Sequence, residues 1–172
     1  SKTALGRMHI GRLICWALFL FWFVCPAHPA QAATIDSSVL QIVASHDATK
    51  HSGTAFYVHP NILATSFHVI QGAAHITAVH KEIRVRIPSL LAFDPNLDLA
   101  LIYMPLPGPP LPLGGDDIPP WTTLQTMGFA QGESLQKVSV MFQNWKKIEG
   151  TWHLSLLGPI QPGMSGGPVL DP

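Results

Sequence analysis

Short runs of apolar residues, separated by turn residues, recur along the chain from position 39 onwards. Residues 82–87 alternate polar and apolar side chains, as a strand with one wet face does. No apolar period of 3.6 residues is sustained, and regular short strands with turns between them are typical of an all-β sandwich or barrel. We expect a short helical turn at residues 68–72. Strands are expected at residues 39–44, 53–58, 62–65, 75–79, 83–87, 99–104, 122–129, 136–143 and 151–157.

The first 32 residues have the pattern of a secretory signal peptide. Arg7 and Arg12 provide a positive start, residues 13–24 form an apolar core of 12 residues, and an Ala-Gln-Ala cleavage site ends at Ala32. The core is shorter than the ~20 apolar residues that a membrane span needs. We therefore expect export, to the periplasm or the medium, with cleavage after Ala32. An uncleaved N-terminal anchor is the alternative.

Cleavage would change both the cysteine content and the charge. Cys15 and Cys25 precede the cleavage site, so the remaining chain could form no disulfide. It would carry seven basic and ten acidic residues, a net charge of −3, without a basic stripe. Nucleic acid and anionic membrane surfaces are therefore not expected partners of the mature form. No His-Glu-x-x-His motif or cysteine pair offers metal-ligand spacing, and we expect neither a metal nor a cofactor.

Three segments carry the candidate chemistry. The first ends in Thr-Ser-Phe-His at His68, after two short strands joined by a His-Pro-Asn turn. In the second, Asp98 opens an apolar run after a Pro-Asn turn. The third, Gly-Met-Ser-Gly-Gly-Pro, places Ser165 in a tight turn that can present a hydroxyl beside free backbone N–H groups. A serine nucleophile needs a base, and the base needs a carboxylate to fix its tautomer.

In this order the three segments resemble those of the chymotrypsin-fold (trypsin-like) serine peptidases, and most closely their disulfide-free bacterial Deg/HtrA branch. The resemblance covers roughly residues 38–172 and implies an all-β fold of two Greek-key β-barrels of chymotrypsin type. One departure is Phe67, where the family more often has Ala or Asn. Another is that the sequence stops seven residues after Ser165, whereas further strands follow the serine in this fold. The second barrel is therefore expected to be incomplete.

A proline-rich segment at residues 105–120 separates the two expected barrels. It holds seven prolines and three glycines, and proline cannot donate to a central strand ladder. We interpret it as a stiff surface linker between an N-terminal barrel at 33–104, with His68 and Asp98, and a partial C-terminal barrel at 121–172, with Ser165. A ligand for SH3- or WW-like domains is the alternative interpretation of such a composition.

The resemblance implies a role for each site residue. Ser165 would be the nucleophile, His68 the general base and Asp98 its orienting carboxylate, and the N–H groups of Gly163 and Ser165 would form the oxyanion hole. Met164 would contribute only its peptide. The competing carboxylate, Asp94, has the context of a turn-opening residue, whereas Asp98 leads into a buried strand where a carboxylate would be desolvated unless partnered.

These roles predict a serine endopeptidase that cleaves polypeptide substrates through an acyl-enzyme. One alternative is a catalytically silent trypsin-like domain that acts as a binding or sensing module. Another is a serine esterase on a different fold, because residues 163–167 also read Gly-x-Ser-x-Gly. No helical pattern follows that motif, however, and the histidine precedes the serine. Nothing in the pattern indicates an oligomeric state.

Overall fold

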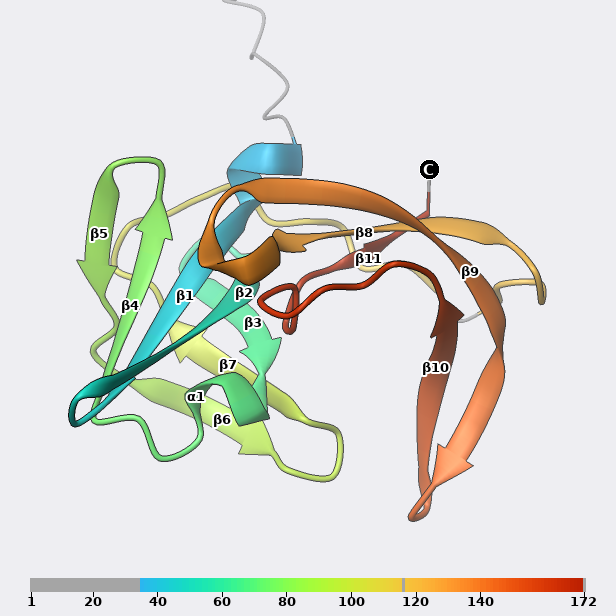
Figure 1. Cartoon of the computed structure of the whole chain (residues 1–172), viewed down its shortest axis with the longest axis horizontal. Coiled ribbons are helices and arrows are strands. Elements are labelled where there is room, and N and C mark those ends of the chain that lie inside the picture. Colours follow the sequence, from blue (N-terminus) through green and yellow to red (C-terminus); the bar gives the residue numbers. More distant parts are fainter. Residues whose placement is uncertain (1–34, 116, 172) are drawn as a thin grey trace, which may run out of the picture. The chain divides into compact units, whose positions relative to one another are not determined.

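The structure, a computed structural model, describes residues 35–115 and 117–171, which belong to one compact unit spanning Ala32–Pro172. These residues form two antiparallel sheets (Figure 1), in the strand orders β5-β4-β1-β2-β3-β7-β6 and β10-β9-β8-β11. No helix in this described part is long and apolar enough to cross a membrane. The predicted signal peptide and its cleavage site lie outside the described residues.

The described part of the chain contains two 3-10 turns, one helical turn and eleven strands, joined by loops. In chain order they are η1 (Ile35–Ser38), β1 (Val39–His46), β2 (Thr49–His59), β3 (Ile62–Ser66), α1 (Phe67–Ile70), β4 (His75–His80), β5 (Ile83–Arg86), β6 (Leu90–Asp94), β7 (Leu99–Tyr103), β8 (Thr123–Phe129), η2 (Ala130–Gly132), β9 (Leu135–Ile148), β10 (Thr151–Leu157) and β11 (Val169–Leu170).

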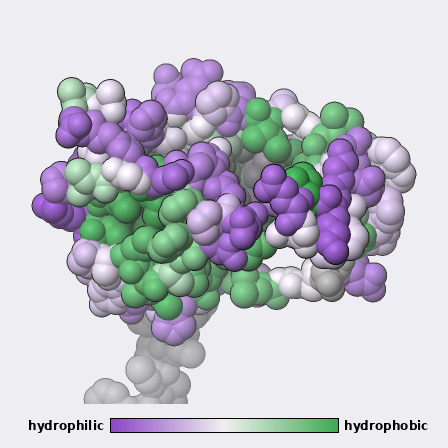
Figure 2. Space-filling view, turned by 90° about the horizontal axis from the view of Figure 1, so that it is seen from below, coloured by the Kyte–Doolittle hydropathy of each residue, from purple (hydrophilic) through white to green (hydrophobic). Residues whose placement is uncertain are grey.

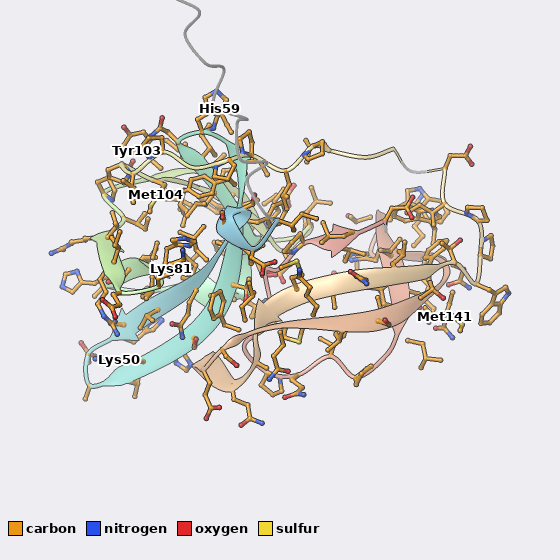
Figure 3. The ribbon with its side chains drawn as sticks, turned by 90° about the horizontal axis from the view of Figure 1, so that it is seen from above. Lys50, His59, Lys81, Tyr103, Met104 and Met141 are labelled. Atoms are coloured by element: carbon orange, nitrogen blue, oxygen red, sulfur yellow. The ribbon has the colours of Figure 1, made fainter. Side chains whose placement is uncertain are left out.

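The core of the seven-stranded sheet comes from alternate residues of its central strands. Leu40 and Ile42 of β1 are fully buried, and so are Leu63 of β3 and Ile102 of β7. Burying a side chain of this size contributes about 1.5–3 kcal/mol, which makes the apolar alternation the main cause of this sheet. Lys50 and His59 mark the two ends of β2, and Tyr103 lies near His59 (Figure 3), as the strand register requires.

The edge strands β5 and β6 of this sheet are consecutive in the chain. Only residues 87–89 separate them, and Pro88 lies in the middle of this bend. The N–H of Ile87 donates to Ile76 (2.9 Å), and Ser89 accepts from the N–H of Tyr103 (3.0 Å). The covalent chain therefore brings the two edges of the sheet together, and the sheet curls back on itself.

The four-stranded sheet packs around a smaller core. Leu124, Val140 and Phe142 are buried in it, and Leu154 and Leu156 of β10 pack against them. Among the described residues, β10 and β11 are its unpaired edges, so this sheet does not close. The predicted fold class, all-β with two β-barrels of chymotrypsin type, is confirmed in its two antiparallel sheets, although neither sheet is a closed barrel in the described residues.

Two strands escaped prediction, β6 and β11. β6 reads Leu-Leu-Ala-Phe-Asp without polar alternation, because it is an edge strand whose apolar side chains remain in contact with water. Leu90, Leu91 and Phe93 are 43–56% exposed, and apolar side chains gather on the face of the molecule seen in Figure 2. β11 has only two residues and lies beyond a glycine-rich loop, where no periodicity can be seen.

The proline-rich segment contains no strand or helix in its described residues and runs along the first sheet. The Tyr57 hydroxyl donates to the Leu106 carbonyl (2.7 Å), and the Leu111 N–H donates to the Tyr57 carbonyl (2.8 Å). Gly108 lies against the Tyr57 ring, since a Cβ there would come within 2.1 Å of a ring carbon. The segment is therefore anchored, with Leu111 buried, rather than free of the sheet.

Tyr57→Phe should lower the free energy of unfolding by about 0.5–1.5 kcal/mol, because one hydrogen bond to an exposed residue is lost. Burial also raises the pKa of Tyr57, so the folded state holds the phenol proton more tightly than the unfolded chain does. The stability that this raised pKa provides is fully present below about pH 10, the pKa of an unfolded tyrosine. It is lost as the pH rises through the pKa of Tyr57 in the folded state. Urea unfolding of both proteins between pH 7 and 11 measures it. A difference in stability that stays constant over this range would contradict the assignment.

Candidate active site

His68 lies in the single helical turn α1, which follows β3 directly. Val69 and Ile70 anchor this turn in the core of the first sheet, and Gly53 of β2 lies so close that a Cβ there would be 2.4 Å from Val69. The His68 side chain points away from that core and is 57% exposed. The turn therefore presents the imidazole at the surface from a fixed backbone.

Asp98 binds α1 through its main chain and both carboxylate oxygens. Its carbonyl accepts from the N–H of Phe67 (3.0 Å), Oδ1 accepts from the N–H of His68 (2.8 Å), and Oδ2 lies 2.6 Å from Nδ1 of His68. Its φ of +50° is in the left-handed region, which aspartate tolerates better than most residues. This backbone conformation turns the carbonyl and the carboxylate toward the same helical turn.

The contact fixes the state of the imidazole. An ionised carboxylate only accepts hydrogen bonds, so Nδ1 of His68 carries the proton of this bond. In the neutral ring Nε2 then keeps its lone pair and can take a proton from a neighbouring hydroxyl. Asp98 thus has the imidazole partner that its position called for, although its side chain is 42% exposed, because it lies in the turn before β7 and not inside the strand.

Asp94 has a different part in the same turn. Its Oδ1 accepts from the N–H groups of Asn96 (2.8 Å) and Leu97 (3.2 Å), which closes the Pro-Asn turn. Of the two aspartates that compete in the sequence, Asp98 is therefore the one whose carboxylate contacts His68. Asp94 shapes the turn that delivers it.

Ser165 lies in the serine loop, residues 158–168 between β10 and β11, which forms hydrogen bonds with strands of both sheets. Its glycines touch other backbone atoms directly: a Cβ at Gly166 would lie 2.2 Å from the Thr54 carbonyl oxygen, and a Cβ at Gly167 would lie 1.9 Å from that of Met127. Gly163 and Gly166 also have positive φ values, +92° and +87°. The glycines of the motif are thus required both by conformation and by close approach.

Every carbonyl from Pro162 to Ser165 accepts a hydrogen bond. The donors are, in order, the N–H of Gln131 (2.7 Å), the hydroxyl of Thr54 (2.8 Å), the N–H of Gly167 (3.0 Å) and the N–H of Thr54 (2.8 Å). In a planar trans peptide the N–H points away from the carbonyl of the preceding residue. The bonds to Pro162 and Met164 therefore also orient the N–H groups of Gly163 and Ser165. Neither N–H donates to an acceptor among the described residues.

The η2 turn that holds Pro162 is itself tied to the first sheet. Gln41 of β1 donates its side-chain amide to the Gly132 carbonyl (2.7 Å) and to the Ser52 hydroxyl (3.0 Å). Gln131, next to Gly132, supplies the N–H that binds Pro162. The first sheet thus supports the serine loop through two residues: Thr54 binds the loop directly, and Gln41 binds the η2 turn that holds Pro162.

The structure brings His68 and Asp98 into contact, whereas no hydrogen bond joins the Ser165 hydroxyl to His68 among the described residues. The loop that carries Ser165 approaches the histidine turn through its backbone. A Cβ at Gly166 would lie 2.8 Å from the N atom of Ser66, the residue that caps α1. The residue after the serine therefore packs against the start of the helical turn that carries the histidine.

Sequence reasoning missed the part played by Met164. This side chain is only 3% exposed, and Gly128 of β8 lies so close that a Cβ there would be 2.6 Å from the Met164 Cα. Met164 therefore anchors the loop in the protein interior and contributes more than its peptide. A large apolar residue inside a glycine-rich loop is the signal that could have indicated this.

The described residues contain no group of three or more His, Cys, Asp or Glu side chains arranged to hold a metal ion. Two histidines of the first sheet, His46 and His51, meet edge to face with ring centroids 5.4 Å apart. His75 instead contacts Arg86 (2.8 Å). None of these contacts reaches the serine loop.

Comparison with known proteins identifies related sequences. Residues 53–172 match the family defined by the trypsin-like peptidase domain. Two curated relatives from Mycobacterium tuberculosis strains, Serine protease Rv3671c and Serine protease MT3772, are each 24% identical to this chain over 157 residues. The alignment covers 84% of this chain and 39% of each relative, so this chain spans about two fifths of their length.

Solved structures share the fold. The active form of the Rv3671c protease from M. tuberculosis superposes with a TM-score of 0.73 at 20% identity, covering 80% of this chain and 66% of that one. The HtrA-type protease AlgW, solved with a tripeptide, gives 0.71 at 21% identity and covers 79% and 48%. Deg5 gives 0.64 at 21% identity and covers 79% and 75%. The expected likeness to the Deg/HtrA branch is confirmed.

Two glycines with nearly equal φ test how tightly the serine loop is packed. Gly166 (φ +87°) faces the Thr54 carbonyl, whereas Gly150 (φ +89°), in the β9–β10 turn, has nothing within 4 Å of a Cβ position. Gly150→Ala should cost only the left-handed backbone, about 1–2 kcal/mol. Gly166→Ala should cost about 1–3 kcal/mol more, because the new methyl group overpacks the site. Urea unfolding compares them, and equal losses would contradict the packing argument.

Proposed function

This chain belongs to the family of trypsin-like peptidases, and on that premise we propose that it is an exported serine endopeptidase that hydrolyses polypeptides with Ser165, His68 and Asp98. The observation that carries the proposal is the double contact of Asp98 with His68, at the main-chain N–H (2.8 Å) and at Nδ1 (2.6 Å). Such a contact orients a general base and leaves Nε2 free. The curated relatives are named serine proteases, which agrees with this function.

In the proposed acylation step, the Ser165 hydroxyl oxygen attacks the carbonyl carbon of the scissile peptide. His68 takes the hydroxyl proton at Nε2, and the Asp98 carboxylate stabilises the resulting imidazolium through Nδ1. The negative charge that develops on the carbonyl oxygen would be accepted by the N–H groups of Gly163 and Ser165. One such donor is worth about 2.7–4 kcal/mol in the transition state, more than a contact between exposed charges provides.

Collapse of the tetrahedral intermediate breaks the C–N bond. The His68 imidazolium gives its proton to the leaving amine, and the acyl group stays on Ser165 as an ester. Water then attacks the ester carbonyl and loses a proton to His68. The second tetrahedral intermediate breaks its bond to the Ser165 oxygen, the His68 imidazolium returns the proton to that oxygen, and the carboxylic acid leaves. Atoms and charges balance without a metal or an organic cofactor.

A catalytically silent binding domain is the other function that this family membership allows. The bound carbonyls of the serine loop favour catalysis over that alternative. They leave the N–H groups of Gly163 and Ser165 without partners among the described residues, which is the arrangement an oxyanion requires. A domain that only binds polypeptides has no need for this orientation.

A fluorophosphonate probe, which reacts only with an activated serine, tests the proposal in the full-length natural protein. Ser165→Ala should abolish labelling, and His68→Ala and Asp98→Asn should slow both labelling and peptide hydrolysis by orders of magnitude. Because the three residues act as a unit, a double variant should be little worse than the worst single variant. Additive losses would refute the triad.

Asp94→Asn is the matched control for Asp98→Asn. The asparagine side-chain oxygen can still accept from Asn96 and Leu97, so the turn and the activity should both be kept. The two aspartates lie four positions apart in one turn, and a nonspecific effect of charge removal would appear in both variants. Equal losses in the two variants would remove Asp98 from its proposed role.

The proposed export has its own test. The sequence pattern predicts cleavage after Ala32, so the mature protein should begin at Ala33. Mass spectrometry of the amino-terminal peptide from periplasmic or secreted protein measures this directly. Recovery of a peptide that still contains Met8 would contradict cleavage and favour the uncleaved anchor.

A further inference from the structure

The Thr54 hydroxyl joins the two sheets at the serine loop. Thr54 lies in β2 and is fully buried. Its hydroxyl donates to the Gly163 carbonyl (2.8 Å) and accepts from the N–H of Phe129 in β8 (3.0 Å). The hydroxyl thus acts both as a donor and as an acceptor, and both of its partners belong to the second half of the chain. A valine in the same space could satisfy neither.

The main chain of Thr54 adds two further bonds. Its N–H donates to the Ser165 carbonyl (2.8 Å), and its carbonyl accepts from the buried hydroxyl of Thr65 (2.6 Å). Thr54 therefore binds the carbonyls of Gly163 and Ser165, the two residues whose N–H groups form the proposed oxyanion hole. Through Thr65 it is also bonded to the strand that leads into α1 and His68.

Close packing leaves Thr54 little freedom to move. A Cβ at Gly128 would lie 2.9 Å from its hydroxyl oxygen, and a Cβ at Gly166 would lie 2.2 Å from its carbonyl oxygen. Any residue larger than glycine at position 128 or 166 would displace Thr54 from its position between β8 and the serine loop. Small displacements are therefore passed directly to the loop, because the interior has no space to absorb them.

We infer that Thr54 is a positioning residue of the proposed hydrolysis. It binds the Gly163 and Ser165 carbonyls, whose peptide groups alternate with those of the two oxyanion donors, and so fixes the position of the Gly163–Ser165 segment against the strand pair that leads to His68. It touches no reacting atom. The inference rests on the proposed function and adds to it a residue outside the three motifs.

The decisive variant is Thr54→Val, which keeps the shape of the side chain and removes the hydroxyl. The Gly163 carbonyl and the Phe129 N–H then lose their partner, and the loop relaxes. We expect kcat to fall about ten- to a hundredfold, less than the ~10²–10³-fold loss for deleting an oxyanion donor. KM for a peptide substrate should stay within about threefold, because ground-state binding is kept. Affinity for a peptide boronate, whose adduct fills the oxyanion hole, should fall with kcat.

Two further variants separate positioning from stability. Thr54→Ser restores the hydroxyl and should restore kcat to within about threefold of the wild type. Thr126→Val removes another buried hydroxyl, one that donates to Pro168 (3.1 Å), a carbonyl that also accepts from the N–H of Met127 (3.3 Å). It is thus a matched threonine-to-valine change beside the same loop, and kcat should be unchanged. Each kcat is taken per active site, titrated with the fluorophosphonate probe, so that unfolded protein does not count.

The outcomes separate this inference from the function on which it rests. A wild type that the probe does not label overturns the proposed function and the role of Thr54 with it. A labelled wild type whose kcat is matched by that of Thr54→Val overturns the role of Thr54 alone. An equal fall in kcat for Thr126→Val does the same. If Thr54→Val does not fold, Thr54→Ala, which removes the hydroxyl without placing a methyl group in its position, replaces it, and a wild-type kcat there counts against the role.

Discussion

The conformation of the serine loop depends on direct contacts between its backbone and the backbone of neighbouring strands. Gly166 and Gly167 lie against carbonyl oxygens of β2 and β8 at distances that exclude any side chain, and the carbonyls from Pro162 to Ser165 are all bound. Buried peptide groups need partners, so the loop has few conformations that satisfy all of them at once. The direction of the free N–H groups follows from this constraint, and so does the choice of residues in the motif.

The same contact explains how two sheets with separate cores share one site. His68 lies in α1 and Asp98 in the turn before β7, both beside the first sheet, whose core includes residues of β1, β2, β3, β4 and β7 together with α1. Ser165 follows β10 of the second sheet, but its loop is bonded to Thr54 of the first. The hydrogen bonds of Thr54 therefore contribute to the placement of the serine loop, with the proposed nucleophile, relative to the strands that lead to His68.

Most strands, and the three chemical segments, could be predicted from sequence because apolar alternation and turn residues act locally. β6 could not, since an edge strand with exposed leucines has no alternation to detect. The burial of Met164 and the hydroxyl bonds of Thr54 also escaped prediction. In both cases the contacting residue lies more than 30 positions away along the chain, and no local sequence pattern indicates such a contact. Asp98 was placed by its motif, but its 42% exposure depends on the turn around it.

That exposure bears on how the pair with His68 is maintained. A contact between two largely exposed side chains contributes little to stability by itself, since water competes for both groups. The geometry is instead imposed by the backbone: Asp98 has a left-handed conformation and binds the N–H groups of Phe67 and His68, which α1 holds in place through Val69 and Ile70. An orientation imposed in this way does not require a dry site before substrate arrives. In the proposed hydrolysis, a polypeptide lying across the pair would exclude water and strengthen the Asp98–His68 contact at the step where His68 is proposed to become charged.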